Sequence, residues 1–510
     1  MAFRMISVGQ KVVKFNRYRH QQGSRFPGAA FTHPSSRSYY HSNEALKPSE
    51  PEPEPELINA DGSYPFHLYS KSQIVNIFSR YAPQLDHRPF VAAAEVFPMR
   101  VNNYVVENLI DWSNVPHDPI FKLVFPQPEM LLPEQLDRVR SSRTRLSPPQ
   151  RQKLAEEIRA TLNPHPAGQK EENVPMLDGI SVEGMQHKYR ETVLFFPMEG
   201  QFCHSFCTYC FRWAQFTSVG SDQQFKSKDQ EALKHYLASH PFVKDLLFTG
   251  GDPMVMNSRT FARYVTPLLN NPETQHLQTI RIGTKSLAYW PYRYTHDSDA
   301  KALLNMFERI VNSGKHLSIQ AHFSHPKELQ TPQVQEAMKL IQMTGAVIRC
   351  QSPLIRHVND SAETWSTMWN LQTRLGAIPY YMFVERDTGA RDYFSVPLAK
   401  AYEIFNGAYA KLAGTARTVR GPSMSAGPGK IGLVGISTIH GEKVFVLKFL
   451  QARNPKWLGE TFFAKFDPQA NWLNDLKPAF GEKEFFFEPE YNDTSKNYPG
   501  SSGQRTYQCS

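Results

Sequence analysis

The chain has 510 residues, of which 40% are hydrophobic and 21% are charged, and its formal net charge is +9. A chain of this length exceeds one compact core, so we expect a globular protein with two or more structural units. No run of about 18 apolar residues occurs, which argues against a membrane span. Residues 1–43 hold seven Lys or Arg and no Asp or Glu, so the remainder is close to neutral and offers no electrostatic surface for nucleic acid.

Residues 1–43 have the composition of an organellar transit peptide: rich in arginine, containing serine and free of acidic residues. The stretch Arg37-Ser-Tyr-Tyr40 is similar to a mitochondrial processing site. Sparse cysteine in the rest of the chain fits a reducing compartment. The sequence therefore predicts the mitochondrial matrix as the location. A basic tail on a cytoplasmic protein is the alternative.

Residues 44–57 are predicted to be a Pro/Glu linker, and residues 58–185 to be mostly helical. The linker contains repeated Pro-Glu pairs, a composition typical of an extended, charged spacer. Residues 70–78 and 148–161 carry apolar side chains at helical spacing. Because nothing in this region carries obvious chemistry, we expect it to be a scaffold or cap beside a catalytic unit.

Three of the five cysteines fall within eight residues, as Cys203, Cys207 and Cys210. Thiolates concentrated in this way usually hold zinc or an iron–sulfur cluster. A structural zinc site takes four ligands, commonly from two CxxC pairs, and the second pair is missing. A 4Fe–4S cluster held by three thiolates would leave one iron open to a substrate. Three unrelated buried cysteines, or a local disulfide, are the alternative on spacing alone.

From residue 192 the pattern changes to alternating strands and helices. Six apolar runs are suited to buried parallel strands, and amphipathic stretches separate them. The predicted strands are residues 192–197, 245–249, 279–283, 316–323, 346–350 and 378–384, and the predicted helices are residues 230–239, 299–312, 333–343 and 361–374. The fold class expected is α/β, with an open, partial (β/α)6 TIM-like barrel at residues 186–400.

The predicted barrel brings two motifs to one end. In barrel enzymes the loops at the C-terminal ends of the strands hold the site. The cysteine loop follows the first predicted strand, and Gly250-Gly251-Asp252 follows the second. We therefore expect both loops to lie at the same edge of the sheet. On its own, a Gly-Gly-Asp-Pro sequence is also a common turn.

The C-terminal region, residues 401–510, is predicted to be a β-containing extension. Residues 431–438 and 443–450 have the pattern of a hairpin around His440-Gly441, and an aromatic-rich tail follows. Cys350 ends a predicted strand and is expected to be a small core residue, and Cys509 is expected to be exposed. We predict no structural zinc site from these two remaining cysteines.

The residues around these motifs resemble the lysine 2,3-aminomutase family of radical S-adenosylmethionine (SAM) enzymes. CxxxCxxC with Tyr209 before the last cysteine is the radical SAM signature, and the likeness runs from about residue 186 to 435. Seven further blocks follow in the family's order: Cys210-Phe-Arg-Trp213, Thr249-Gly-Gly-Asp-Pro253, Arg281-Ile-Gly-Thr284, His322-Phe-Ser-His-Pro326, Val358-Asn-Asp360, Pro379-Tyr-Tyr381 and Ala426-Gly-Pro-Gly-Lys430.

The resemblance implies a function and a set of site residues. The implied activity is that of a radical SAM amino-acid 2,3-aminomutase, an isomerase that moves an α-amino group to the β-carbon through a 5′-deoxyadenosyl radical. It implies a 4Fe–4S cluster, SAM and pyridoxal 5′-phosphate (PLP) as cofactors, and a flavodoxin- or ferredoxin-type electron donor as a partner. It leaves the oligomeric state open. The implied roles are cluster ligation by Cys203, Cys207 and Cys210, SAM binding by Tyr209, Gly250, Gly251 and Asp252, and PLP attachment by Lys430.

Lys430 closes a loop that is too rich in glycine and proline to be helical. A phosphate-binding P-loop is excluded, because Met424 stands where the first glycine belongs and Ile431 replaces Ser or Thr. In the family, a lysine at the end of such a loop holds PLP, although Pro428 interrupts the glycine run here. A solvated surface lysine is the alternative.

Substrate-binding positions depart from the family pattern. Arg212 matches the arginine that holds the substrate α-carboxylate, and a guanidinium suits that bidentate role. Arg386 and Ser423 stand where two aspartates bind the distal ammonium of lysine. An acidic or uncharged amino acid therefore fits these positions at least as well as lysine, and a glutamate-like substrate is our first choice for a departure from lysine. A slip of one residue that brings Asp387 into register would undo this argument.

Two other classes of protein fit parts of the sequence. The first is a radical SAM enzyme that acts on another substrate without PLP. The second is a non-enzymatic protein in which three cysteines hold a structural metal.

Overall fold

The computed structural model describes residues 62–162, 173–217 and 225–496. The predicted transit peptide, the predicted linker and Cys509 lie outside these ranges. Residues 56–510 form one unit, to which all the described elements belong. In the part of the chain that the structure describes, every helix is too short or too polar to cross a membrane.

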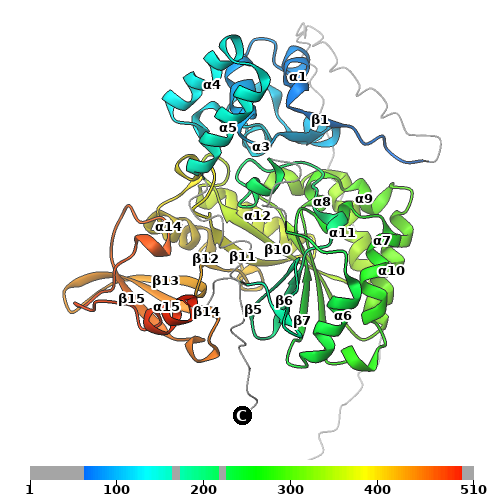
Figure 1. Ribbon diagram of the computed structural model, residues 1–510, viewed down its shortest axis with the longest axis vertical. Coiled ribbons are helices and arrows are strands. Elements are labelled where there is room, and N and C mark those ends of the chain that lie inside the picture. Colours follow the sequence, from blue (N-terminus) through cyan, green and yellow to red (C-terminus); the bar gives the residue numbers. More distant parts are fainter. Residues whose placement is uncertain (1–61, 163–172, 218–224, 497–510) are drawn as a thin grey trace, which may run out of the picture. The chain divides into compact units, whose positions relative to one another are not determined.

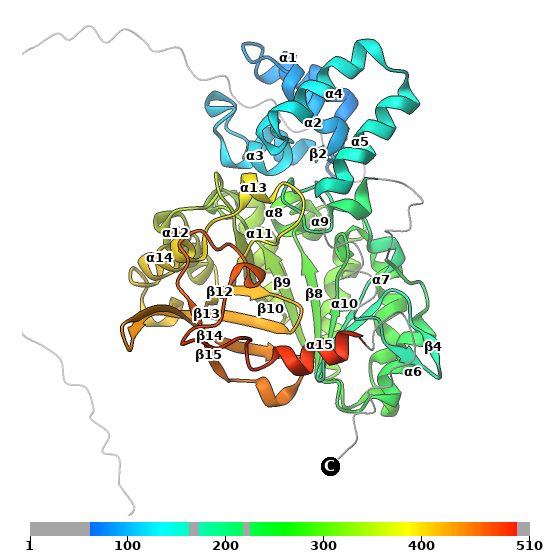
Figure 2. The same cartoon turned by 60° about the vertical axis from the view of Figure 1, so that its left-hand side comes forward.

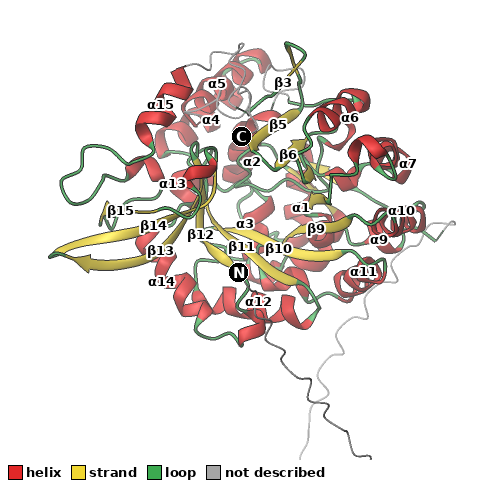
Figure 3. Cartoon of the chain, turned by 90° about the horizontal axis from the view of Figure 1, so that it is seen from below, coloured by secondary structure: helices red, strands yellow, loops and turns green. Residues whose placement is uncertain are grey.

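An eleven-stranded sheet organises the molecule, with its strands in the order β15-β14-β13-β12-β11-β10-β9-β8-β7-β6-β5. Figure 3 shows these strands as a curved sheet with helices along its outer side. The strands are β5 (Met185–Tyr189), β6 (Thr192–Phe195), β7 (Asp245–Phe248), β8 (Thr279–Thr284), β9 (His316–His322), β10 (Val347–Leu354), β11 (Ile378–Val384), β12 (Arg420–Ser425), β13 (Gly429–Ile439), β14 (Glu442–Ala452) and β15 (Thr461–Lys465).

Strands β6 to β12 all run parallel, each paired with its neighbour in chain order. The six strands expected from the sequence are present within a few residues of their predicted bounds, so the α/β partial-barrel prediction is confirmed. β12 adds a seventh parallel strand that the sequence analysis did not predict. Its sequence, Arg-Gly-Pro-Ser-Met-Ser, contains Gly and Pro, which are depleted in strands.

Helices between the strands cover the outer face of the parallel sheet (Figures 1 and 2). The helices of this part of the chain are α6 (Gln230–Ser239), α7 (Ser258–Val265), α8 (Ser286–Tyr289), α9 (Tyr292–Thr295), α10 (Ala300–Asn312), α11 (Pro332–Met343), α12 (Ala362–Arg374), α13 (Arg391–Phe394) and α14 (Leu398–Tyr409). The helices predicted at 230–239, 299–312, 333–343 and 361–374 correspond to α6, α10, α11 and α12. Each of these four buries an apolar stripe against the sheet, as the helical spacing of their hydrophobic residues requires.

The N-terminal described region is helical apart from the short strand pair β1 (Leu68–Ser70) and β2 (Arg100–Asn102). Its helices are α1 (Ile74–Tyr81), α2 (Arg88–Val96), α3 (Pro119–Val124), α4 (Pro133–Arg145) and α5 (Pro148–Leu162). Buried aromatic side chains such as Phe78 and Phe121 join the same hydrophobic core as the barrel strands. Before the barrel, residues 176–181 form a second small hairpin, β3 (Met176–Leu177) with β4 (Ile180–Ser181).

The C-terminal strands turn the parallel sheet into an antiparallel one. β13 and β14 form the hairpin predicted around His440-Gly441, and β15 pairs with β14. The aromatic-rich tail packs on this part of the sheet, where Trp457, Trp472 and Phe487 belong to a second hydrophobic core. The last described helix, α15 (Glu488–Lys496), follows that core. Cys350, in β10, is buried, as predicted.

Candidate functional site

The loop that carries the three cysteines leaves β6 at its C-terminal end and has little regular structure. The loop after β7 packs directly against it, because the Asp252 amide donates hydrogen bonds to the carbonyl oxygens of Phe202 (2.6 Å) and Gly200 (3.0 Å). The two loops therefore lie at the same edge of the sheet, as predicted.

The helical N-terminal region also holds the cysteine loop, a contact that the sequence analysis did not foresee. The Phe206 amide donates to Arg100 O at 2.8 Å, and the Thr208 amide donates to Leu123 O at 2.8 Å. Asn102, which is fully buried, donates from Nδ2 to His204 O at 3.1 Å. This region is thus more than a cover, because its backbone shapes the loop between the first and last cysteine.

The glycine pair Gly250-Gly251 permits this close approach of two backbones. A Cβ added at Gly251 would lie 2.5 Å from Phe202 O and 2.6 Å from Phe202 N, distances that a side chain cannot occupy. Gly250 has φ +138° and faces the Gln201 side chain. In this structure the glycines therefore accommodate the cysteine loop itself.

Asp252 is buried, and its carboxylate is fully engaged by neighbouring groups. Oδ1 accepts hydrogen bonds from the Met254 amide (2.9 Å) and from Thr284 Oγ1 (2.7 Å), and Oδ2 accepts one from the Lys285 amide (2.9 Å). Burial raises the pKa of Asp252 to about 6, against the opposing effect of these bonds. The carboxylate thus ties the ends of β7 and β8 together, and SAM binding by Asp252 stays a prediction.

The three cysteine thiols sit in a setting that disfavours bare thiolates. Burial raises the pKa of Cys203 and Cys207, and raises the pKa of Cys210 to about 12. Three adjacent, half-buried thiolates therefore need a cationic centre to neutralise them, and an iron–sulfur cluster takes such ligands. Within the described residues no three His, Cys, Asp or Glu side chains are arranged to hold one metal ion. In a cluster each thiolate binds a different iron, so the donor set fits a cluster without converging on one point.

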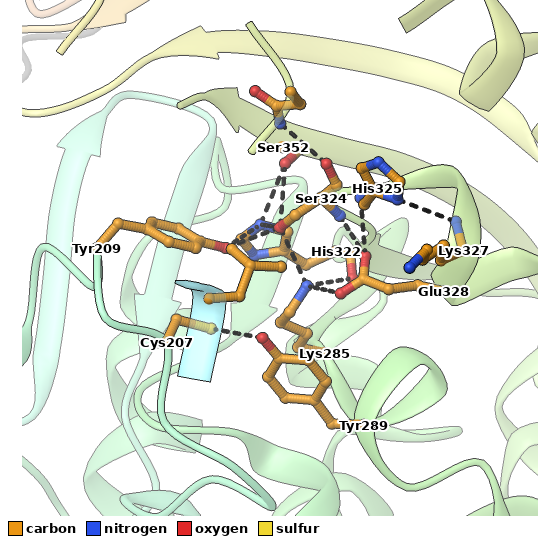
Figure 4. Close-up of polar contacts among 12 residues, drawn as sticks. Cys207, Tyr209, Lys285, Tyr289, His322, Ser324, His325, Lys327, Glu328 and Ser352 are labelled. Atoms are coloured by element: carbon orange, nitrogen blue, oxygen red, sulfur yellow. Dashed lines mark hydrogen bonds and ion pairs between the residues drawn. The ribbon is translucent and has the colours of Figure 1, made fainter. Parts of the chain in front are cut away.

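A buried polar network adjoins the cysteine loop (Figure 4). Tyr209 Oη contacts His322 Nε2 at 2.8 Å and Ser324 Oγ at 2.9 Å. Lys285 Nζ donates to Ser324 Oγ (3.1 Å) and forms an ion pair with Glu328 Oε1 (2.8 Å). Burial and the nearby Lys285 charge lower the pKa of His322 well below its usual range, so its ring is neutral. Tyr209 is thus anchored at the C-terminal end of β9.

Lys430 is the second residue of β13, whereas the sequence analysis placed it at the end of a loop. It pairs with Ser425 at the C-terminal end of β12. Its ammonium lies 4.1 Å from the ring centroid of Tyr381 and 5.4 Å from that of Phe383. Burial, together with the charges of Arg281 and Arg420, lowers the pKa of Lys430 to about 7. The amine is therefore far more available as a nucleophile than an ordinary lysine.

Groups from three elements hold the loop that precedes Lys430. Lys188 of β5 donates a hydrogen bond to Ala426 O. Arg453, just after β14, donates from Nε to Gly427 O at 2.8 Å, and its amide donates to Pro428 O at 3.0 Å. The Tyr491 hydroxyl lies so close to Gly427 that a Cβ there would meet it at 2.1 Å. These contacts set the direction in which Lys430 enters β13.

The structure brings Arg212 and Arg386 to the same aromatic ring. The guanidinium carbon of Arg212 is 5.2 Å from the Phe211 centroid, and that of Arg386 is 5.4 Å from it. Arg386 also lies 5.9 Å from the Trp472 ring. Burial, together with the nearby Arg386 charge, lowers the pKa of Arg212 to about 10. The two predicted substrate-binding cations are thus neighbours.

Glu385, which precedes Arg386 in the chain, and the predicted substrate residue Ser423, in β12, differ from the two aspartates of the family. Burial raises the pKa of Glu385 well above its usual range, which favours its neutral form. Ser423 is buried, and its hydroxyl donates to Met382 O at 3.4 Å. Glu385 therefore adds less negative charge beside Arg386 than an ordinary glutamate would.

Some contributors were within reach of sequence reasoning and some were not. Thr284, His322 and Asn359 belong to blocks that the resemblance marked without giving them roles; here Asn359 Nδ2 donates to Ser324 O at 2.9 Å. Asn102 and Tyr289 carried no signal in the sequence. Their roles at the cysteine loop depend on contacts between segments more than a hundred residues apart in the chain.

The chain is similar in sequence to several proteins named as lysine 2,3-aminomutases. It is 28% identical over 407 residues to the "Putative L-lysine 2,3-aminomutase" of Aquifex aeolicus (strain VF5), covering 79% of this chain and 94% of that protein. It is 30% identical to the L-lysine 2,3-aminomutase of Escherichia coli (strain K12) over 44% of this chain and 60% of the relative. It is 26% identical to the L-lysine 2,3-aminomutase of Clostridium subterminale, over 44% of this chain and 50% of the relative.

No family model matches the chain. Among solved structures, a radical SAM methyltransferase from Sphaerobacter thermophilus superposes over 56% of this chain and 84% of that one. The TM-score is 0.32 and the identity is 13%, a likeness too loose to carry an argument.

The contact between the glycine pair and the cysteine loop can be tested with Gly251→Ala. The added methyl group would meet the Phe202 backbone, so the loop must move. We expect less iron and sulfide per chain after anaerobic reconstitution, and a free energy of unfolding lower by about 1–3 kcal/mol. Gly414→Ala is the matched control, since a Cβ there has nothing within 4 Å. Full iron content in Gly251→Ala would contradict this role.

Proposed function

We propose, from the premise that this chain is a lysine 2,3-aminomutase-like radical SAM enzyme, that it is an isomerase that moves the amino group of a small amino acid between adjacent carbons. The cluster, SAM and PLP would supply, when bound, the one-electron chemistry and a carbonyl group that holds an amine. One observation carries the proposal. The three cysteines and Arg212 follow the C-terminal end of β6, Arg386 follows that of β11, and Lys430, whose pKa is lowered to about 7, pairs with Ser425 at that of β12.

The cysteine loop would hold the cluster through Cys203, Cys207 and Cys210. Hydrogen bonds with β2, α3 and the Asp252 turn keep that loop in place. The three sulfurs would therefore be preorganised for cluster binding. A flavodoxin- or ferredoxin-type protein would deliver the electron, a proposal that the family resemblance alone supports.

Lys430 would attach PLP. Its low pKa leaves a large fraction of neutral amine at pH 7, and neutral amine is the form that attacks a carbonyl carbon. The Tyr381 ring beside it offers an aromatic face. Arg420, which donates to Tyr381 Oη at 3.3 Å, supplies a cation suited to a phosphate group. These residues fit the cofactor in chemistry and in sign of charge.

The PLP proposal can be tested by trapping at different pH values. A lysine whose pKa is lowered to about 7 is protonated and unreactive below that pH and neutral above it. We therefore expect borohydride to fix PLP on Lys430 with a yield that rises through half its maximum near pH 7. Peptide mapping by mass spectrometry identifies the labelled lysine.

Two variants complete the trapping experiment. Lys430→Ala should abolish the label and keep the iron content, whereas Lys448→Ala, which removes an exposed lysine of β14, should change neither. Undiminished PLP labelling in Lys430→Ala would refute the attachment site. It would leave a radical SAM enzyme without PLP as the explanation, provided that the protein still cleaves SAM. A colourless protein that binds zinc and no iron would instead favour a non-enzymatic metal site.

An acidic amino acid is the proposed substrate, with glutamate first and lysine as the alternative. Arg212 would hold the α-carboxylate, and the adjacent Arg386 would hold the side-chain carboxylate. A lysine ammonium next to Arg386 would instead face a like charge. The raised pKa of Glu385 favours its neutral form and so reduces its competition with a substrate carboxylate.

A panel of free amino acids tests the substrate. With reduced, reconstituted enzyme we expect β-amino product from glutamate ahead of lysine. Arg386→Ala should raise the KM for glutamate roughly ten- to a hundredfold, the loss expected for a hydrogen bond to a charged group. Arg391→Ala, which removes an exposed arginine nearby, should leave the KM unchanged. Efficient turnover of lysine, unaffected by Arg386→Ala, would show that the substrate is not acidic.

We also propose the mitochondrial matrix as the location, supported only by the composition of residues 1–43. Deletion of residues 1–43 should keep a fluorescently tagged protein out of mitochondria and leave reconstituted SAM cleavage unchanged. Matrix import of the shortened chain would overturn the proposal.

A further inference from the structure

A tyrosine hydroxyl approaches one of the three cysteine sulfurs. Tyr289 is the last residue of α8, the short helix that follows β8, and its side chain is buried. Its Oη lies 3.5 Å from Cys207 Sγ, within hydrogen-bonding distance for sulfur (Figure 4). A tyrosine phenol has a pKa of about 10 and therefore carries its proton at neutral pH. A cluster-bound thiolate has no proton to give, and the phenol must therefore be the donor.

Asn102 holds the two partners together. Its side-chain Nδ2 donates to Tyr289 O at 2.7 Å and to His204 O at 3.1 Å. Its backbone amide donates to Ser205 Oγ at 3.0 Å. One buried side chain thus joins the backbone of the tyrosine to the loop that carries Cys207. Because Asn102 binds the backbone of Tyr289 and of the cysteine loop, the fold itself keeps the Tyr289 hydroxyl close to the Cys207 sulfur.

A buried cation lies against the same tyrosine. Lys285 Nζ is 4.6 Å from the Tyr289 ring centroid and 2.8 Å from Glu328 Oε1. A cation over the face of the ring draws electron density from it, and this makes the hydroxyl a better hydrogen-bond donor. Glu328 is fully buried and Lys285 nearly so, and the ion pair fixes the lysine in this position.

We propose that Tyr289 is a positioning residue that donates a hydrogen bond to Cys207 Sγ and raises the reduction potential of the cluster. The proposal rests on the proposed function, because it requires a cluster on the three cysteines. A hydrogen bond to a ligating sulfur withdraws electron density, and it stabilises the reduced cluster more than the oxidised one because the reduced form is more negative. The reduced cluster is the state that must pass an electron to SAM.

Removal of one oxygen atom tests the proposal. Tyr289→Phe keeps the ring and its packing but loses the donor. In reconstituted protein without SAM, we expect the midpoint potential of the one-electron cluster couple to fall by about 59 mV, which corresponds to a tenfold change in the equilibrium constant for reduction. Electron paramagnetic resonance during a redox titration measures the potential, and iron and sulfide analysis verifies an intact cluster.

Tyr294→Phe is the matched control. Tyr294 is also fully buried nearby, but its hydroxyl contacts Ser286 Oγ at 2.6 Å. We expect removal of the Tyr294 hydroxyl to leave the midpoint potential equal to that of the unmodified protein. Fluorinated tyrosine at position 289, whose phenol is more acidic and a stronger donor, should shift the potential upward. This second variant keeps the test decisive if Tyr289→Phe fails to assemble a cluster.

Two failures can be told apart. An unmodified protein that takes up no iron would end the proposed function, and with it this inference. A protein that assembles the cluster and cleaves SAM, but whose potential is the same with tyrosine, fluorinated tyrosine or phenylalanine at position 289, would overturn the inference alone. In that case Tyr289 would serve only to pack the core.

Discussion

A loop that carries three cysteines has almost no regular structure of its own, so its shape depends on hydrogen bonds from other segments. Backbone groups of β2, α3 and the turn after β7 provide them, through Arg100, Leu123 and Asp252. Because these bonds join main-chain atoms, they require the segments to approach closely, and Gly251 makes this possible on one side. If these segments moved apart, the hydrogen bonds would be lost and the positions of the three cysteine sulfurs would no longer be fixed.

Buried charge is arranged so that each end of the site has a distinct electrostatic character. Near the cysteines, Asp252 is surrounded by donors and Lys285 is paired with Glu328, so the charges there are compensated within the protein. At the other end, Arg212 and Arg386 lie beside one another and Glu385 is held towards its neutral form. The end near the cysteines suits a cluster with its own charge, and the end with the two arginines suits an anionic small molecule.

Lys285 connects these features. Its amide donates to Asp252, its ammonium reaches Glu328 and Ser324, and it lies over the Tyr289 ring. A single residue at the end of β8 therefore joins the turn after β7, the end of β9 and the cysteine loop. Such a chain of fully bonded polar groups in a low-dielectric interior is rigid, and rigidity of this kind keeps reacting partners at a set distance.

The sequence by itself determined the parallel sheet, because buried parallel strands appear as continuous apolar runs, and it determined which loops share an edge, because the strand ends carry Cys203 and Gly250. It did not predict β12, whose Gly and Pro are poor strand formers, nor that Lys430 lies within a strand. Only the tertiary structure decided that Asn102 holds the cysteine loop, that Tyr289 reaches Cys207, and that Arg212 and Arg386 meet at Phe211. Each of these contacts joins segments far apart in the chain through single side chains, and no local periodicity or spacing records such a contact.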